Sequence, residues 1–162
     1  WRIIVKLTEA KLKQMILESI QRSKNYEKLK SLMMTKEGLL QAESLYEMLR
    51  DTFDDEEQMH MDILFAPLGL AREREELRER YLEAYEAFQA ASPEDQEQAF
   101  MQMDLAEKAV KDKSGEWSSS LKKLKSHLKQ YSSELPYELH GVIVDASLDI
   151  MTRVHKYVGI TR

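Results

Sequence analysis

The chain has 162 residues, enough for one domain or two small ones with a hydrophobic core of their own. It has no cysteine, which excludes disulfides, thiolate nucleophiles and cysteine-based zinc or iron–sulfur sites. Charged residues make up 33% of the chain and the net charge is −5, a composition typical of long helices with wide solvated faces.

The sequence has neither a membrane-segment pattern nor a secretory signal pattern. No apolar run approaches the roughly 18 residues that span a bilayer, and residues 1–5 are too few for a signal-peptide core. A cysteine-free chain fits a reducing compartment, so we expect a cytoplasmic or virion location and no membrane partner.

Charge is unevenly distributed along the chain. Residues 1–36 carry nine Lys or Arg and three Glu, whereas residues 37–100 carry five Arg and eighteen Asp or Glu. A basic head before an acidic body has two interpretations. In the commoner interpretation, basic and acidic helices pack against each other within one molecule. In the other, the basic segment binds an anionic partner or a second copy of the chain.

Apolar residues recur at helical spacing from the start of the chain. The first predicted helix covers residues 9–24, with Thr8 as N-cap and an extension to Met33 left open. Its apolar face consists of Leu12, Met15, Ile16 and Ile20. A second helix starts near Thr35 and stops around residues 51–54. Asp54 and Glu57 then have the D-x-x-E form of a capping box, which predicts the start of a third.

The later helices are delimited by proline, glycine and serine. The third is short and ends at residues 67–69, which read Pro-Leu-Gly, and residues 72–90 form the next. Ser92 and Pro93 predict the start of another helix, and this helix should end before Ser114-Gly115. Two more helices follow, one from Trp117 to residues 132–133 and one from Pro136 to a C-terminal cap at Gly159. Strand-like alternation is confined to residues 3–6.

Six to seven helices joined by short turns predict an all-α fold, either a helical bundle or stacked helical hairpins. We expect a basic N-terminal segment and helix over residues 1–34 and a helical body over residues 35–162. A single domain that includes both is the alternative.

Glu57-x-x-His60 is the sharpest local pattern with chemical meaning, because on a helix it puts a carboxylate and an imidazole on one face, as in di-iron carboxylate bundles. Such sites need a second pair, and none of His127, His140 and His155 follows a Glu by three residues. No nucleophile elbow or phosphate-binding glycine loop is present either. We therefore predict no cofactor, no metal and no enzymatic activity, and keep a metal-dependent bundle enzyme around Glu57 and His60 as an alternative.

Two kinds of surface could bind a partner. Residues 121–129 form a basic amphipathic helix, and with the N-terminal lysines they suggest a nucleic-acid-associated protein, against which the acidic middle argues. A core-facing Leu stripe with solvated Lys is the ordinary reading. The apolar run at residues 63–71 is either a buried corner or an apolar knuckle that docks on another subunit. The candidate interaction residues are Ile3, Ile4, Lys11, Lys13, Ile63, Leu64, Phe65, Leu68, Lys122, Lys123, Lys125 and Lys129.

Residues 6–18, KLTEAKLKQMILE, resemble the K-L-T-x-x-K-L-(K/R)-x-x-I-x-E opening of uncharacterised tailed-bacteriophage proteins, marine ones especially. The resemblance implies a viral structural or assembly context and no particular activity. Together these observations predict a non-enzymatic helical structural or interaction protein, part of a larger assembly such as a viral particle, with a protein partner or self-association.

Overall fold

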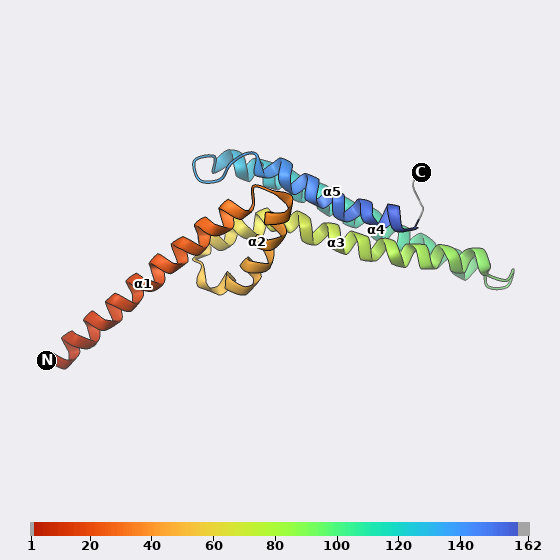
Figure 1. Ribbon diagram of the computed structural model, residues 1–162. Helices are drawn as coiled ribbons and strands as arrows, with labels where there is room; N and C mark the ends of the chain where they lie inside the picture. The colour runs from red at the N-terminus through yellow and green to blue at the C-terminus, as the bar shows by residue number, and fades with distance from the viewer. Residues whose placement is uncertain (1, 159–162) are drawn as a thin grey trace. The chain divides into compact units, whose positions relative to one another are not determined.

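The computed structural model describes the backbone of residues 2–158 and the side chains of residues 9–151. Over this range the chain forms five α-helices and one short 3-10 helix, without a β-strand (Figure 1). The elements are α1 (Arg2–Leu32), α2 (Lys36–Leu49), η1 (Arg50–Thr52), α3 (Asp55–Ala90), α4 (Gln96–Gln130) and α5 (Leu139–Val158). The all-α prediction is confirmed, and residues 3–6 are helical.

The chain divides into two compact units inside α3. The N-terminal unit is Trp1–Met61 and the C-terminal unit is Asp62–Arg162. The expected boundary after residue 34 falls within the N-terminal unit, in the turn between α1 and α2.

The N-terminal unit is built by the C-terminal half of α1 packing on α2. Tyr26, Leu29 and Met33 of α1 are buried, and so are Leu39 and Tyr46 of α2. Side-chain caps set the turns: the helix start expected near Thr35 and the capping box predicted at Asp54 and Glu57 are both confirmed. The Thr35 hydroxyl accepts from the Gly38 amide at 3.0 Å, which starts α2. Asp54 and Glu57 exchange backbone-to-carboxylate hydrogen bonds of 3.0 and 2.8 Å, which start α3.

An aromatic cluster closes this unit around η1. The Phe53 ring centroid lies 5.9 Å from that of Tyr26 and 6.0 Å from that of Tyr46. The Gln58 side-chain amide donates to the carbonyls of Arg50 and Phe53, at 2.9 and 3.1 Å. These bonds hold η1 against the first turn of α3, so the short α2–α3 connection is a defined structure.

The C-terminal unit is a long α3–α4 hairpin with α5 folded back along α4 (Figure 1). Arg74 Nε donates to Ser114 Oγ at 2.6 Å, and Lys113 Nζ lies 3.0 Å from a carboxylate oxygen of Glu73. Near the end of the hairpin the Phe88 and Phe100 ring centroids are 5.8 Å apart. The buried apolar side chains of α4 and α5 are Leu124, Leu128, Leu139, Ile143, Ala146, Ile150 and Met151.

The predicted helix break at residues 67–69 is wrong, because α3 passes through Pro67 without ending. A proline inside a helix costs about 3 kcal/mol through a lost hydrogen bond and a steric clash. Leu64, Leu68 and Ala71 around it have no exposed surface, and burying side chains of this kind stabilises by about 1.5–3 kcal/mol each for the larger ones. The free energy gained by burying these side chains therefore exceeds the cost of the proline.

The predicted break at Ser114-Gly115 is also wrong, because both residues lie inside α4. The Ser114 hydroxyl donates to the Val110 carbonyl at 2.9 Å while accepting from Arg74, so the serine is satisfied within the helix. A helical glycine costs only about 1 kcal/mol. With both breaks removed, the expected six to seven helices become the five α-helices of residues 2–158.

Two expected helix starts are corrected as well. α1 begins at Arg2 and runs through Thr8, which is therefore not an N-cap. After Ser92 and Pro93 the chain makes a turn, and α4 begins at Gln96. The Ser92 hydroxyl donates to the Asp95 carboxylate at 3.1 Å instead of capping the helix. The cap expected at Gly159 lies outside the described residues.

Among the residues searched, none of the helices combines the length and apolar character needed to cross a bilayer.

Candidate functional site

The N-terminal half of α1 carries a row of apolar side chains that are left exposed by the described residues of the N-terminal unit. Leu12, Met15, Ile16 and Ile20 are 56, 57, 51 and 47% exposed, respectively. These four residues, hereafter the α1 stripe, lie on one side of the helix because they are spaced by three and four positions. Every residue from 9 to 21 is exposed. A contiguous apolar surface of this kind on a helix is typical of a contact with another chain.

Two residues of the stripe, Leu12 and Met15, continue the face that α1 buries farther along. Tyr26, Leu29 and Met33 follow one another by three and four residues and are buried. The same alternating spacing, continued toward the N-terminus, passes through Arg22 and Ser19 to Met15 and Leu12. Apolar residues with this 3.5-residue period form the seam of a coiled coil. The seam is therefore apolar at Leu12 and Met15 and polar at Ser19 and Arg22, and Ile16 and Ile20 of the stripe lie beside it.

Arg22 marks the position where packing of α1 within its own unit stops. Its Nε lies 3.2 Å from Glu57 Oε1, and its Nη2 lies 3.9 Å from Asp54 Oδ2. The Glu57 side chain also caps α3, so one carboxylate joins the start of α3 to α1. The guanidinium thus takes a seam position where the apolar core ends and charged groups begin.

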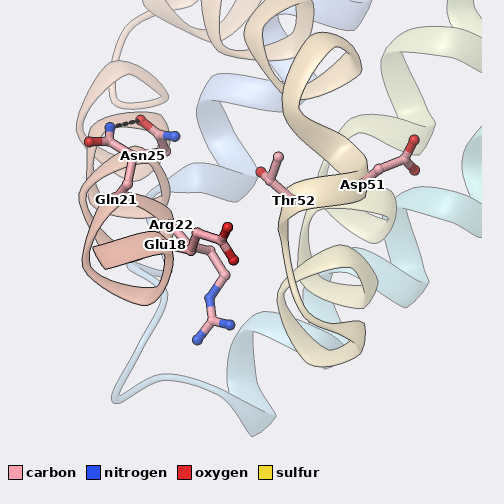
Figure 2. A pocket seen from close by; sticks show the side chains of 6 residues that line it. All are labelled: Glu18, Gln21, Arg22, Asn25, Asp51 and Thr52. Carbon is pink, nitrogen blue, oxygen red and sulfur yellow. Dashed lines mark hydrogen bonds between the residues drawn. The ribbon is translucent and has the colours of Figure 1, made fainter. Parts of the chain in front are cut away.

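An open hollow of about 450 Å³ lies beside Arg22 in the N-terminal unit. Figure 2 shows its lining, which comes from α1 on one side and η1 on the other: Glu18, Gln21, Arg22, Asn25, Asp51 and Thr52. Gln21 donates to Asn25 at 3.1 Å, and the Thr52 hydroxyl donates to the Leu49 carbonyl at 2.6 Å.

Both charged and neutral polar side chains line this hollow, and most of them already have a hydrogen-bond or ion-pair partner. Its one guanidinium is paired with Asp54 and Glu57, and its carboxylates belong to the exposed residues Glu18 and Asp51. The lining has no histidine or cysteine to activate the Thr52 hydroxyl. The hollow therefore lacks the nucleophile-and-base pairing that would point to a catalytic centre.

The structure does not bring Glu57 and His60 together as a ligand pair. Glu57 is engaged by Arg22 and by the Asp54 amide. His60 is buried, and its Nε2 lies 3.6 Å from Oε1 of Glu56, four residues earlier in the helix. Within the N-terminal unit, Glu56 and His60 each offer a ligand atom that a metal ion could share.

Comparison with protein-family models, curated proteins and solved structures gave no match. No related protein therefore indicates what the exposed apolar row or the hollow binds.

Two of the predicted interaction residues flank the α1 stripe. Lys11 and Lys13 are exposed. Lys11 lies along the seam, next to Leu12, whereas Lys13 projects from another side of the helix because a helix turns by 100° per residue. Ile3 and Ile4 belong to α1, but their side chains lie outside the described residues.

The apolar residues of the predicted knuckle lie inside the fold. Leu64, Phe65 and Leu68 are buried and Ile63 is half-buried, all within the continuous helix α3. Without a helix break no corner forms, so these residues present no apolar knuckle.

The predicted basic helix at residues 121–129 is part of α4. Leu124, His127 and Leu128 are buried, whereas Lys122, Lys123, Lys125 and Lys129 are exposed. Lys125 acts on His140 of α5: burial first, and then the Lys125 charge, lower the pKa of His140 below its usual 6.5. Solvated lysines around an apolar face are the ordinary amphipathic arrangement.

Sequence reasoning missed the α1 stripe as a site, although it identified the same four residues as a helical face. It also missed a smaller apolar surface on α4, where Phe100, Met101 and Leu105 are 51, 58 and 64% exposed. Periodicity shows which residues share a face, but it carries no signal of whether a neighbour covers that face.

Proposed function

We propose that the protein is a non-enzymatic helical component of a larger assembly, and that it joins the assembly through the α1 stripe. The stripe is the observation that supports this proposal: four large apolar side chains in two turns and a half of helix, each about half exposed. Isolated exposed apolar residues need no explanation, but a row along a helix costs solubility unless a partner covers it.

Helix-in-groove or helix-on-helix docking is the recognition mode that suits this surface. An amphipathic helix offers anchors at positions i, i+3, i+4 and i+8, which are the spacings of Leu12, Met15, Ile16 and Ile20. The resemblance of residues 6–18 to tailed-bacteriophage proteins falls on the same helix, which favours a virus particle as the assembly.

Incorporation into the native assembly tests this proposal. Ile16→Asp puts a charge in the middle of the stripe, so we expect it to reduce incorporation at least tenfold relative to the unsubstituted chain, since a buried unpaired charge is strongly unfavourable. The measurement is the amount of chain that co-sediments with particles or complexes from cells that produce both.

Leu17→Asp is the matched control. Leu17 is 66% exposed and lies about 100° around α1 from Ile16, away from Leu12 and Met15, so the same chemical change should reduce incorporation far less. Equal incorporation of the Ile16→Asp and Leu17→Asp variants would overturn the proposed function. Circular dichroism of both variants should show the same helix content, because the substituted side chains touch no core residue.

A further inference from the structure

We infer that the C-terminal unit binds an oxyanion, a phosphate or a carboxylate, between Arg74 of α3 and Trp117 of α4. The inference goes beyond the proposed function, because the α1 stripe belongs to the N-terminal unit and takes no part in this site. It is carried by hydrogen-bond donors on both side chains from which no described residue accepts, and by a positive charge that no described carboxylate pairs with.

The Arg74 guanidinium makes one hydrogen bond within the described residues, and that bond goes to a neutral group. Its Nε donates to Ser114 Oγ at 2.6 Å. A guanidinium carries five N–H donors, so those of the two Nη nitrogens remain, and no described residue accepts from them. Burial first, and then the charge of Arg78, lower the pKa of Arg74 below its usual value. A partly buried cation in such surroundings is stabilised by an anion.

Lys113 shows that the same hairpin pairs another of its cations fully. Its Nζ lies 2.8 Å from a carboxylate oxygen of Glu116 and 3.0 Å from one of Glu73, and hydrogen bonds to these two groups raise the pKa of Lys113. Glu73 precedes Arg74 in the sequence, but a helix turns by 100° per residue, so the two side chains leave α3 in different directions. Two carboxylates therefore pair with one lysine, and no described carboxylate pairs with Arg74.

Trp117 adds a buried donor on the face of α4 that Arg74 contacts. Its Nε1 is buried, and no described residue accepts a hydrogen bond from it. Trp117 follows Ser114 by three residues, so the two side chains are neighbours on the helix surface. Side chains on a helix lean toward its N-terminus, which places the indole over the turn that holds Ser114. A buried N–H without an acceptor is unfavourable, so an acceptor at this point would stabilise the unit.

The donors at this site define the chemistry of the ligand. Guanidinium and indole N–H groups donate and cannot accept, so the ligand must offer acceptors. A water molecule has two protons of its own to place and no charge to offset that of Arg74. The oxygens of a carboxylate or a phosphate accept several hydrogen bonds and form short, charge-assisted bonds with arginine.

The indole N–H signal of Trp117 in an NMR titration tests the inference. The chain has two tryptophans, and a Trp1→Phe variant assigns the signal of Trp117. Sodium phosphate or sodium acetate is added to about 50 mM at constant ionic strength, well above the roughly millimolar Kd expected of a few charge-assisted hydrogen bonds. We expect a saturable shift of the Trp117 signal, and the anion that saturates it at the lower concentration is the better ligand.

Variants of the two donors provide the second measurement. Arg74→Gln should weaken the binding roughly tenfold or more, because it removes a charged donor. Arg80→Gln is the matched control, since Arg80 is exposed on another side of α3, and it should leave the affinity unchanged. Trp117→Phe keeps an aromatic ring and removes the N–H, so the rise in Tm that the anion gives over chloride should be lost in this variant and kept in Arg80→Gln.

The outcomes decide the inference in both directions. A saturable Trp117 shift that Arg74→Gln weakens and Arg80→Gln preserves supports the site. The absence of a saturable shift with either anion overturns it. A shift of equal affinity in the Arg74→Gln chain, or a rise in Tm that Trp117→Phe keeps in full, overturns it as well.

Discussion

Arg22 Nε lies 3.2 Å from Glu57 Oε1, and this contact is where α1 changes from a packed helix to an open one. On its C-terminal side Tyr26, Leu29 and Met33 are buried in the N-terminal unit, and on its N-terminal side every described residue is exposed. The ion pair also restrains the carboxylate that caps α3. The contribution of the Arg22–Glu57 ion pair to stability can be measured separately from that of the cap.

Asp54→Ala should destabilise the chain by about 1 kcal/mol, because it removes the N-cap acceptor of α3. Glu57→Gln keeps an oxygen for the Asp54 amide and loses only the charge toward Arg22, so it should cost less than about 1 kcal/mol. Urea unfolding followed by circular dichroism measures both. A larger loss for Glu57→Gln than for Asp54→Ala would contradict the reading of Glu57 as a cap supported by a modest ion pair.

Met33→Ala and Met15→Ala remove the same atoms from one seam in two environments. Met33 has no exposed surface, so its truncation should cost about 2–5 kcal/mol through lost burial and a cavity. Met15 is 57% exposed, and its truncation should leave the unfolding free energy of the dilute chain within about 0.5 kcal/mol of the original. Similar losses at both positions in chemical denaturation would show that the stripe is covered.

Gly38→Ala and Gly115→Ala should shift stability in opposite directions. A Cβ at Gly38 would collide with the backbone carbonyl of Leu32, where α2 begins close to the end of α1. We expect a loss of about 1–3 kcal/mol, as for other overpacked sites. A Cβ at Gly115 meets no atom, so alanine there should stabilise α4 by about 1 kcal/mol. Thermal unfolding of the two variants provides the comparison, and a stabilised Gly38→Ala variant would refute the close approach.

His140 should make the C-terminal unit less stable as the pH falls through 6.5. Its folded pKa is lowered, by burial first and by Lys125 second, so the unfolded chain takes up the proton before the folded chain does. The contribution is complete above the unfolded pKa of 6.5 and is lost as the pH drops toward the folded pKa.

His140→Gln should therefore flatten the stability-against-pH curve between pH 6.5 and the folded pKa, relative to the unsubstituted chain. Lys125→Gln should raise the pKa of His140 in an NMR titration, because it removes the repelling charge. An unchanged His140 titration in the Lys125→Gln chain would show that the lysine does not act on it.

Local signals in the sequence predicted much of this fold correctly. Thr35 and the Asp54–Glu57 box start helices where expected, because capping depends on side chains within three residues of one another. Pro67 and Gly115 were expected to end helices and do not, because their cost is a few kcal/mol and the burial of neighbours such as Leu64 and Leu68 exceeds it. Long-range burial cannot be read from a local pattern.

The candidate site shows the same limit more clearly. Leu12 and Met15 have the same spacing as Tyr26 and Leu29 and belong to the same seam, yet the first pair is exposed and the second is buried. The difference arises from α2, which packs on the C-terminal half of α1. The sequence placed these residues on one face, and only the fold distinguishes the part that needs a partner.

Spin labels on α1 test the central claim, that a partner covers the α1 stripe, most directly, and the absence of cysteine makes single labelling simple. Met15→Cys places a label on the stripe, and Gln14→Cys places one on an exposed position on the other side of the helix. In the native assembly the label at position 15 should become less mobile and less accessible to a water-soluble paramagnetic quencher than in the free chain, whereas the label at position 14 should change little. A label at position 15 that is equally mobile and accessible in the free chain and in the assembly would contradict the account.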